Sequence, residues 1–182
     1  MDLVLERITG NVQGIDFTTK DMEWGTAQEP YSRMAYEMAT ERMVEESGFV
    51  YLPNIQAGCS VDGFIHDGGR FGIWESKSPK SKTHLSYLMG NKLPSLYVPQ
   101  VEHNLWITGA SFCDFVSFDP RMPEPLQLFI TRYERDEARI KAHEAAVMQF
   151  LMEVKRDEMN LRAHISRIEA KDAAQLEAAT PF

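Results

Sequence analysis

Two acidic residues and one lysine in the stretch 60–79, SVDGFIHDGGRFGIWESKSP, could do chemistry together. Side chains at positions i and i+2 of a β-strand point to the same face, so Glu75 and Lys77 are expected to project together. If the glycine-rich turn at 66–70 folds the preceding strand against this one, Asp62 can approach the same face. Two carboxylates and one ammonium would then share a small volume, which is typical of a divalent-metal nuclease.

These residue types explain which metal and which reaction we expect. Two neighbouring carboxylates repel one another unless a cation lies between them, and oxygen ligands favour Mg²⁺ or Mn²⁺ over zinc. Asp62 and Glu75 are therefore candidate metal ligands, and the backbone carbonyl of Ser76 could add a third oxygen. Lys77 could help to activate the attacking water and neutralise charge on a phosphate. The competing interpretation is an ion pair on a solvent-exposed strand edge, which contributes little.

The composition is that of an ordinary globular protein. Its 182 residues are 43% hydrophobic and 25% charged, which is sufficient for a single domain with a substantial core. No apolar run reaches the roughly 18 to 20 residues that span a bilayer, and Met1 to Gly10 lacks the apolar core of a secretory signal. We therefore expect a cytoplasmic protein, in which Cys59 and Cys113 are buried thiols rather than a disulfide.

The net charge of −8 argues against a protein that coats nucleic acid nonspecifically. A local basic patch is still present, because no acidic residue occurs from Ser76 to Gln100. Lys80, Lys82 and His84 in this patch are candidate DNA contacts. The alternative is that the patch is only a solvated loop.

Several elements must position these side chains. Apolar residues at three- and four-residue spacing between Trp24 and Glu46 predict an amphipathic helix, which Pro30 delays to Gln28 or Glu29 and which Gly48 ends. A second helix is expected from Leu96 to Trp106, with Gln100 on an adjacent face. The expected strands form a sheet of about five members and cover Phe49 to Leu52, Cys59 to Ile65, Phe71 to Ser76, Phe112 to Phe118 and Leu126 to Tyr133.

The chain from Asp136 almost to Thr180 has no internal glycine or proline and predicts one long helix or two. We expect its first half to pack on the sheet and the part after Arg156 to project, to contact a sister subunit or to fray. The predicted organisation is a single nuclease domain over 1–182, with a core of about 22–155 and a helical extension of about 156–182.

The order of the motifs between about Trp24 and Phe150 resembles the YqaJ-like viral recombinase family, the phage lambda exonuclease-like alkaline exonucleases of the restriction-endonuclease-like PD-(D/E)xK superfamily. The matching residues are Trp24-Gly25 followed by Glu29, Arg33 and Glu37; Ser60-Val61-Asp62-Gly63; Glu75-Ser76-Lys77-Ser78-Pro79 followed by His84; Tyr97, Gln100, Trp106 and Gly109; Cys113-Asp114-Phe115; Phe118-Asp119-Pro120-Arg121; and Arg135-Asp136-Glu137. Each piece alone is weak, but their order and spacing together are specific.

The resemblance implies an α/β fold with a restriction-endonuclease-like core, a central mixed sheet flanked by helices and a long C-terminal helix. It implies an exonuclease that uses Mg²⁺ (or Mn²⁺) and degrades linear double-stranded DNA from 5′ to 3′. The products would be mononucleotides and a 3′ single strand, which an annealing protein uses in phage-type homologous recombination. It further implies a ring-shaped homotrimer that threads DNA, made by a phage or prophage in a bacterial host.

The resemblance also assigns roles to individual residues. It implies that Asp62, Glu75 and the carbonyl of Ser76 bind metal and that Lys77 activates the attacking water. Glu29 would assist at a second metal ion. Gln100 would position the water or Lys77. Arg33, Lys80, Lys82 and His84 are the candidate DNA contacts.

The N-terminal region departs most from the family. Family members carry an arginine there that contacts the DNA 5′ phosphate, and only the segment from Arg7 to Asn11 is similar to it. A replacement pocket could use Arg33 or the loop from Lys80 to Lys82. Two other functions therefore remain open: a catalytically impaired DNA-binding recombination scaffold, and an endonuclease that uses the same site.

Overall fold

The computed structural model describes residues 1–14 and 18–179. The chain forms two compact units, one of residues 18–144 and one of residues 1–17 together with 145–182. The first unit contains every residue that the sequence singled out for chemistry around the 60–79 stretch. Among the described residues, no helix combines the length and the apolar character that crossing a membrane requires.

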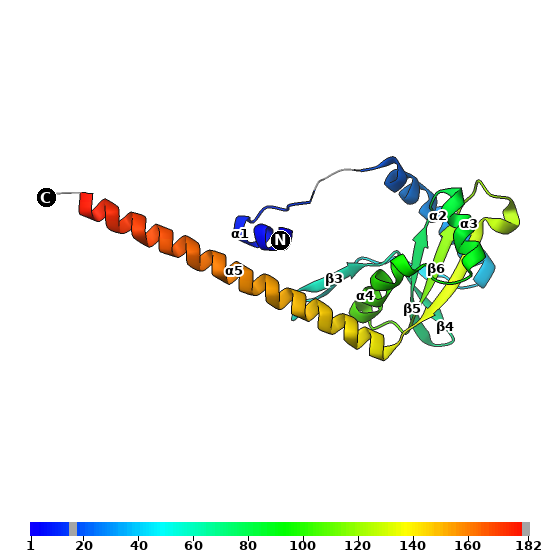
Figure 1. The fold of residues 1–182 in the computed structure, drawn as a ribbon. Coiled ribbons are helices and arrows are strands. Elements are labelled where there is room, and N and C mark those ends of the chain that lie inside the picture. The colour runs from blue at the N-terminus through cyan, green and yellow to red at the C-terminus, as the bar shows by residue number, and fades with distance from the viewer. Residues whose placement is uncertain (15–17, 180–182) are drawn as a thin grey trace. The chain divides into compact units, whose positions relative to one another are not determined.

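The centre of the larger unit is a mixed five-stranded sheet in the order β1-β4-β5-β6-β7. Its central strands β4, β5 and β6 are labelled in Figure 1. Its strands are β1 (Val44–Glu45), β4 (Gly63–Asp67), β5 (Arg70–Lys77), β6 (Phe112–Phe118) and β7 (Leu128–Glu134). Only β5 and β6 run parallel, and the other neighbouring pairs are antiparallel. The predicted α/β class and mixed sheet are therefore confirmed.

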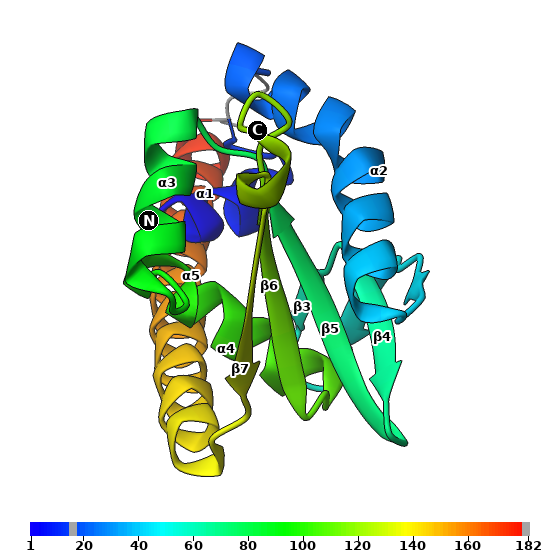
Figure 2. The ribbon, with the colours of Figure 1, turned by 90° about the vertical axis from the view of Figure 1, so that its right-hand side faces the viewer.

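Helix α2 (Lys20–Thr40) covers one face of this sheet (Figure 2). Its Tyr36 packs with Trp74 and other buried residues of the sheet. The predicted start near Gln28 and end at Gly48 are both wrong. Thr19 caps the helix by accepting a hydrogen bond from the Met22 N–H at 3.1 Å, so the first turns form although Pro30 follows inside the helix.

The opposite face is covered by α3 (Ser81–Gly90) and α4 (Val98–Thr108), which follows the short 3₁₀ segment η1 (Ser95–Tyr97) (Figure 2). Buried apolar residues of α4, such as Leu105, pack here in the larger core cluster. The sequence predicted α4 within two residues but not α3. Helix α3 has neither a side-chain cap nor an acidic first turn, so the usual sequence signals of a helix start are missing.

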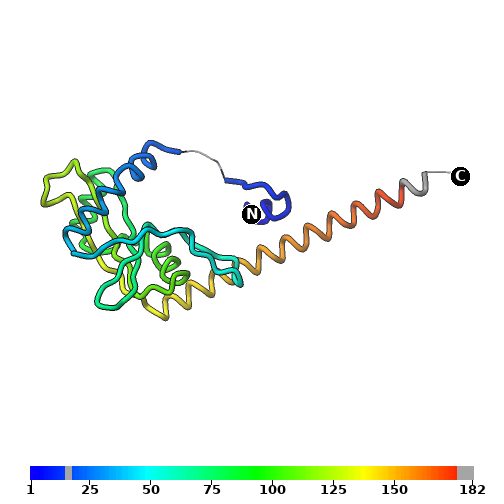
Figure 3. The backbone as a smooth tube through the Cα atoms, turned by 180° about the vertical axis from the view of Figure 1, so that it is seen from behind, coloured from blue at the N-terminus to red at the C-terminus, as the bar shows by residue number. Residues whose placement is uncertain are grey.

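Two hairpins follow α2 in the chain, and the second of them carries Glu75 and Lys77. The β4–β5 turn places Gly68 at φ 57° and Gly69 at φ 80°, a left-handed conformation that glycine adopts without strain. The other hairpin pairs β2 (Phe49–Leu52) with β3 (Ala57–Ser60) in a separate two-stranded sheet, and Figure 3 traces the chain through it after α2. The single strand predicted from Cys59 to Ile65 is therefore wrong, because the chain changes sheets at residues 61–62.

Strand β7 follows the short 3₁₀ segment η2 (Glu124–Leu126) and leads into one uninterrupted helix, α5 (Glu137–Ala179). Asp136 accepts hydrogen bonds from the Ala138 and Arg139 N–H groups, which fixes the start of α5. The predicted end near Thr180 lies outside the described residues. Both Cys59 and Cys113 are buried free thiols, as expected.

The smaller unit combines α1 (Asp2–Thr9) with α5 beyond residue 144. Arg7 Nη1 lies 3.6 Å from Glu158 Oε2, and Arg162 donates a hydrogen bond of 2.8 Å to the Arg7 carbonyl. The two units divide between residues 144 and 145.

Candidate active site

The three residues on which the sequence analysis began lie together at the end of β5. Lys77 Nζ forms a hydrogen-bonded ion pair with Glu75 Oε1 and lies 4.0 Å from Asp62 Oδ2. Asp62 reaches this position because it directly precedes β4, whose Gly63 pairs with Trp74 on β5. The hairpin thus brings the two carboxylates around one ammonium, as the strand pattern predicted.

The alternation of side chains along β5 fixes which groups face which helix. Ser76 points away from Lys77 toward α2, where its hydroxyl lies 2.7 Å from that of Ser32. The Ser76 backbone N–H donates a hydrogen bond of 2.7 Å to Asp62 Oδ2. Asp62 is therefore held by the strand backbone on one side of the site, while Glu75 and Lys77 point toward α4.

Helix α4 supplies two amides that hold the Glu75 carboxylate. Gln100 Nε2 donates to Glu75 Oε1 at 2.7 Å, and Asn104 Nδ2 donates to Glu75 Oε2 at 3.2 Å. The two amides are one helical turn apart and thus lie on one face of α4. Glu75 is only 1% exposed, so each of its oxygens depends on these protein donors. Gln100 was predicted, whereas Asn104 was missed although its i+4 spacing from Gln100 was visible.

The electrostatics of the site disfavour its negative charge. Burial raises the pKa of Glu75, and Asp62 adds to the rise while Lys77 opposes it. Desolvation and Asp62 likewise raise the pKa of Glu29. Burial works against the charged form of Lys77, but the carboxylates of Glu75 and Asp62 outweigh it and raise the Lys77 pKa. Three carboxylates thus share one ammonium, and this imbalance would be relieved by an added cation.

A cleft of about 660 Å³ opens next to this cluster. Glu29 from α2 lines it together with Asp62, Ser76 and Lys77, so the third predicted acidic residue does lie at the site. Glu29 and Asp62 also line an adjacent depression of about 560 Å³. The acidic cluster therefore lies where these two hollows meet.

The donor set suits a hard divalent cation. Asp62 and Glu75 offer carboxylate oxygens that already converge on a positive charge, the ammonium of Lys77. Oxygen ligands of this kind match Mg²⁺ and Mn²⁺. Among the described residues, no group of three or more His, Cys, Asp or Glu side chains is arranged to hold a metal ion. The Lys77 ammonium at present pairs with the same two carboxylates that a cation would use.

The residues predicted to contact DNA do not lie together but at separate places around the site. Lys80 lines the cleft and is 76% exposed, with Asp21 Oδ2 at 3.3 Å. Lys82 is exposed on α3. Arg33 lines the adjacent depression, where Glu37 Oε1 accepts from its Nε at 3.0 Å and the Val44 carbonyl accepts from its Nη2.

His84 does not reach the surface. It is 0% exposed, with Nε2 2.8 Å from the Leu126 carbonyl and Nδ1 2.7 Å from Ser117 Oγ. Because a carbonyl only accepts, Nε2 carries the proton and Nδ1 accepts from the hydroxyl. The prediction of a direct DNA contact is therefore wrong for His84 in this conformation, and its place in the basic patch reflects packing of α3.

The sequence analysis assigned no role to Trp24 or Arg121, which also line the cleft. The Arg121 guanidinium carbon lies 4.6 Å from the centre of a Trp24 ring. Both residues belong to the motifs that the resemblance rests on. Their separation by almost a hundred positions concealed that they meet.

Comparisons with known proteins show which family this chain resembles. Residues 1–111 match the YqaJ-like viral recombinase domain. The alkaline exonuclease LHK-Exo from Laribacter hongkongensis is 33% identical in a match that covers 92% of this chain and 83% of that one, with a TM-score of 0.82. A structure of LHK-Exo in complex with dAMP matches over the same shares at 33% identity, with a TM-score of 0.83.

A phage-related exonuclease from Haemophilus somnus 129PT shares the fold alone, at 12% identity and a TM-score of 0.53, over 84% of this chain and 80% of that one. No curated protein matches the chain. The family match covers more than half of the sequence, and the LHK-Exo match covers nearly all of it. The chain belongs to the YqaJ-like viral recombinase family.

Proposed function

We propose that this protein is a divalent-metal-dependent exonuclease that degrades linear double-stranded DNA from 5′ to 3′. The observation that carries the proposal is the convergence of Asp62, Glu75 and Lys77 at the edge of an open cleft. The similarity to an alkaline exonuclease supports the reaction class. That relative has been solved with dAMP, a mononucleotide of the kind that such a reaction releases.

Asp62 and Glu75 would hold the metal ion, with the Ser76 carbonyl as a further oxygen and Glu29 as the acidic residue for a second ion. When bound, the metal would supply Lewis-acid stabilisation of the charge that develops on the scissile phosphate. Gln100 and Asn104 keep the Glu75 carboxylate in one orientation through their amide hydrogen bonds. A fixed orientation matters because preorganised groups lose no energy to rearrangement during the reaction.

Lys77 contacts the same oxygen of Glu75, Oε1, that Gln100 holds. Its Nζ holds its proton while it is paired with Glu75, because the carboxylates raise its pKa. With a cation held by Asp62 and Glu75, the Lys77 ammonium would be available to donate to the attacking water and to a phosphate oxygen. Lys80 and Lys82 would then bind the DNA strand near the cleft, and Arg33 would do so at the adjacent depression.

The family supports further parts of this proposal. We propose Mg²⁺ or Mn²⁺ as the cofactor, mononucleotides and a 3′ single strand as products, and homologous recombination of the phage type as the process. The partners would be DNA ends, a single-strand annealing protein and sister subunits in a homotrimer. The mass of the protein in solution tests the last of these directly.

The test is a digestion assay with two substrates. Linear duplex DNA carrying a 5′ phosphate and a label at either the 5′ or the 3′ end is incubated beside a closed circle, with Mg²⁺ or with EDTA. We expect Mg²⁺-dependent loss of the linear DNA, early release of the 5′ label and an intact circle. Lys77→Ala should abolish the loss, and Lys141→Ala, an exposed lysine at the start of α5, should not.

Each other outcome changes the conclusion in a defined way. Cutting of the circle would identify an endonuclease, and early release of the 3′ label would reverse the polarity. Binding of DNA without Mg²⁺-dependent digestion would identify a recombination scaffold. Equal digestion by Lys77→Ala and wild type would remove Lys77 from the reaction.

A further inference from the structure

Arg121 is fixed at the wall of the cleft by a buried carboxylate. It lies three residues after β6, and its Nε and Nη2 donate to Asp119 Oδ1 and Oδ2 at 2.7 and 3.2 Å. Asp119 also accepts from the Arg121 backbone N–H at 3.0 Å. Asp119 is 0% exposed, so this bidentate pair sets the direction of the Arg121 side chain.

Two further elements hold the same guanidinium. Arg121 Nη2 donates to the Pro79 carbonyl at 2.9 Å, just after the end of β5. The guanidinium carbon lies 4.6 Å from the centre of a Trp24 ring on α2, within the range of a cation–π contact. A group fixed from three directions loses little conformational freedom when it binds a ligand.

The Arg121 guanidinium nevertheless has N–H groups that donate no hydrogen bond to the described part of the protein. The recorded bonds use Nε and Nη2, and Nη1 has no hydrogen-bond partner in the part of the chain that the structure describes. The side chain remains 46% exposed and lines the cleft that also contains Lys77. An arginine that is held rigidly and still has free N–H groups is suited to a planar oxyanion or a phosphate.

Arg132 shows how an arginine with a purely internal role differs. Its Nε and Nη2 bind Asp114 at 2.6 and 2.8 Å, and its Nη1 binds Asp67 at 2.6 Å. It also stacks on Phe112, with 3.8 Å between the guanidinium carbon and the ring centre. Every guanidinium nitrogen of Arg132 is therefore occupied, whereas Arg121 leaves one unoccupied beside the candidate active site.

We propose that Arg121 binds a phosphate of the DNA backbone in the cleft, with Asp119 and Trp24 as the residues that position it. The proposal rests on the proposed function, because the bound strand must lie next to Asp62 and Lys77. Contact with a phosphate is independent of sequence, and it predicts an effect on binding rather than on the chemical step.

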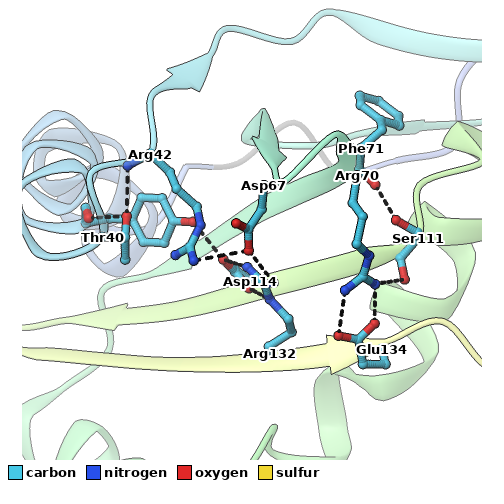
Figure 4. Close-up of polar contacts among 10 residues, drawn as sticks. Thr40, Arg42, Asp67, Arg70, Phe71, Ser111, Asp114, Arg132 and Glu134 are labelled. Atoms are coloured by element: carbon cyan, nitrogen blue, oxygen red, sulfur yellow. Dashed lines mark hydrogen bonds and ion pairs between the residues drawn. The ribbon is translucent and has the colours of Figure 1, made fainter.

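The experiment uses Arg121→Gln and a matched control, Arg70→Gln. Arg70 is also paired bidentately, with Glu134 (Figure 4). It also stacks on an aromatic ring, that of Phe112, but it lies at the start of β5, at the opposite end of the strand from Lys77. Because Arg121→Gln leaves Asp119 buried without its partner, the double variant Asp119→Asn/Arg121→Gln is included, and thermal unfolding shows that each variant is folded.

Binding of a labelled duplex is measured by fluorescence anisotropy in EDTA over a series of salt concentrations, and digestion is measured separately. We expect Arg121→Gln and the double variant to weaken binding about tenfold and to reduce the slope of log affinity against log salt by about 1. In digestion, KM should rise by a similar factor while kcat stays within about twofold. Arg70→Gln should match wild type in both assays.

The two proposals fail in different ways. If wild type binds DNA but does not digest it, the proposed function fails, and the binding series still tests Arg121. If folded Arg121→Gln and the double variant bind DNA with the affinity and salt slope of Arg70→Gln, Arg121 serves only to hold its loop and the inference is overturned. Wild type that does not bind DNA would overturn both.

Discussion

The same strands carry two charge clusters, each with one buried carboxylate, Asp114 or Glu75, and with opposite balance. Near the β4–β5 turn, Arg42 and Arg132 share Asp67, and Arg132 also binds Asp114, so two basic residues meet two acidic ones (Figure 4). At the other end of β5, Lys77 alone faces the carboxylates described above. The first cluster is complete within the protein, whereas the second leaves negative charge to be neutralised from outside.

The pKa directions express the same difference. The hydrogen bonds from Arg132 and Arg42 lower the pKa of Asp67, so the protein stabilises its charged form. Burial raises the pKa of Glu75, so the protein disfavours its charge. A cluster that stabilises its own charges serves the fold, and a cluster that does not is a candidate ligand site.

The largest effect is expected from breaking the balanced cluster. Asp114 is 2% exposed and also accepts a hydrogen bond of 2.7 Å from the Tyr36 hydroxyl. Asp114→Asn would leave Arg132 without its main partner, and removal of one member of a buried ion pair typically costs about 3–5 kcal/mol. Chemical unfolding should show this loss, while the folded fraction should keep normal digestion rates. A loss of activity without a loss of stability would contradict the structural role.

The reverse pattern is expected at the unbalanced cluster. Glu75→Gln should lower digestion about 10²- to 10³-fold, the range seen when one preorganised group is removed from an active site. Without metal, the free energy of unfolding of this variant should be unchanged or higher. The substitution removes the buried negative charge of Glu75, and Lys77 then pairs with Asp62 alone. Unfolding midpoints in EDTA measure this. A decrease of several kcal/mol would mean that Glu75 is as structural as Asp114.

A smaller effect is expected from the amide that the sequence analysis missed. Asn104 is 3% exposed, and its donor to Glu75 Oε2 can be removed by Asn104→Ala. A hydrogen bond to a charged group contributes about 1.5–3 kcal/mol, so kcat/KM should fall at least about tenfold. Calorimetric titration with Mn²⁺ should show weaker binding as well. Unchanged Mn²⁺ affinity together with unchanged kcat/KM would show that Gln100 alone is sufficient to orient Glu75.

The sequence predicted the parts of the site that depend on local spacing. The i, i+2 separation of Glu75 and Lys77 within one strand fixes their common face whatever the remaining fold. The glycines at the β4–β5 turn likewise predict the hairpin that brings Asp62 close. These features required no knowledge of distant contacts.

The parts that were missed depend on tertiary contacts. Asp119 and Arg121 are neighbours in sequence, but only the fold shows that Asp119 is fully buried and that Trp24 packs on the guanidinium. The burial of His84 between Ser117 and Leu126 is equally invisible in a stretch that is basic overall. The start of α2 shifted because the Thr19 cap outweighed the proline that the sequence analysis emphasised.

The smallest predicted effect is a difference in pH dependence between the two clusters. The pKa of Asp67 is lowered from 3.8, so its contribution to stability is present above that pH and is lost as the pH falls through the lower folded value. The pKa of Glu29 is raised from 4.5, so stability is lost as the pH rises from that value through the higher folded one.

Two single variants test these opposite changes of stability with pH. Asp67→Asn should be less stable than wild type at pH 7, and the difference should shrink as the pH falls below 3.8. Glu29→Gln should gain relative to wild type as the pH rises above 4.5, because it removes a carboxylate that burial and Asp62 disfavour. Urea midpoints in EDTA at a series of pH values give both differences. If the two differences changed with pH in the same direction, the contrast between a self-neutralised cluster and one that requires a cation would be wrong. If saturating Mg²⁺ abolishes the advantage of Glu29→Gln while leaving Asp67→Asn unchanged, the cation acts at the cleft and not at the balanced cluster.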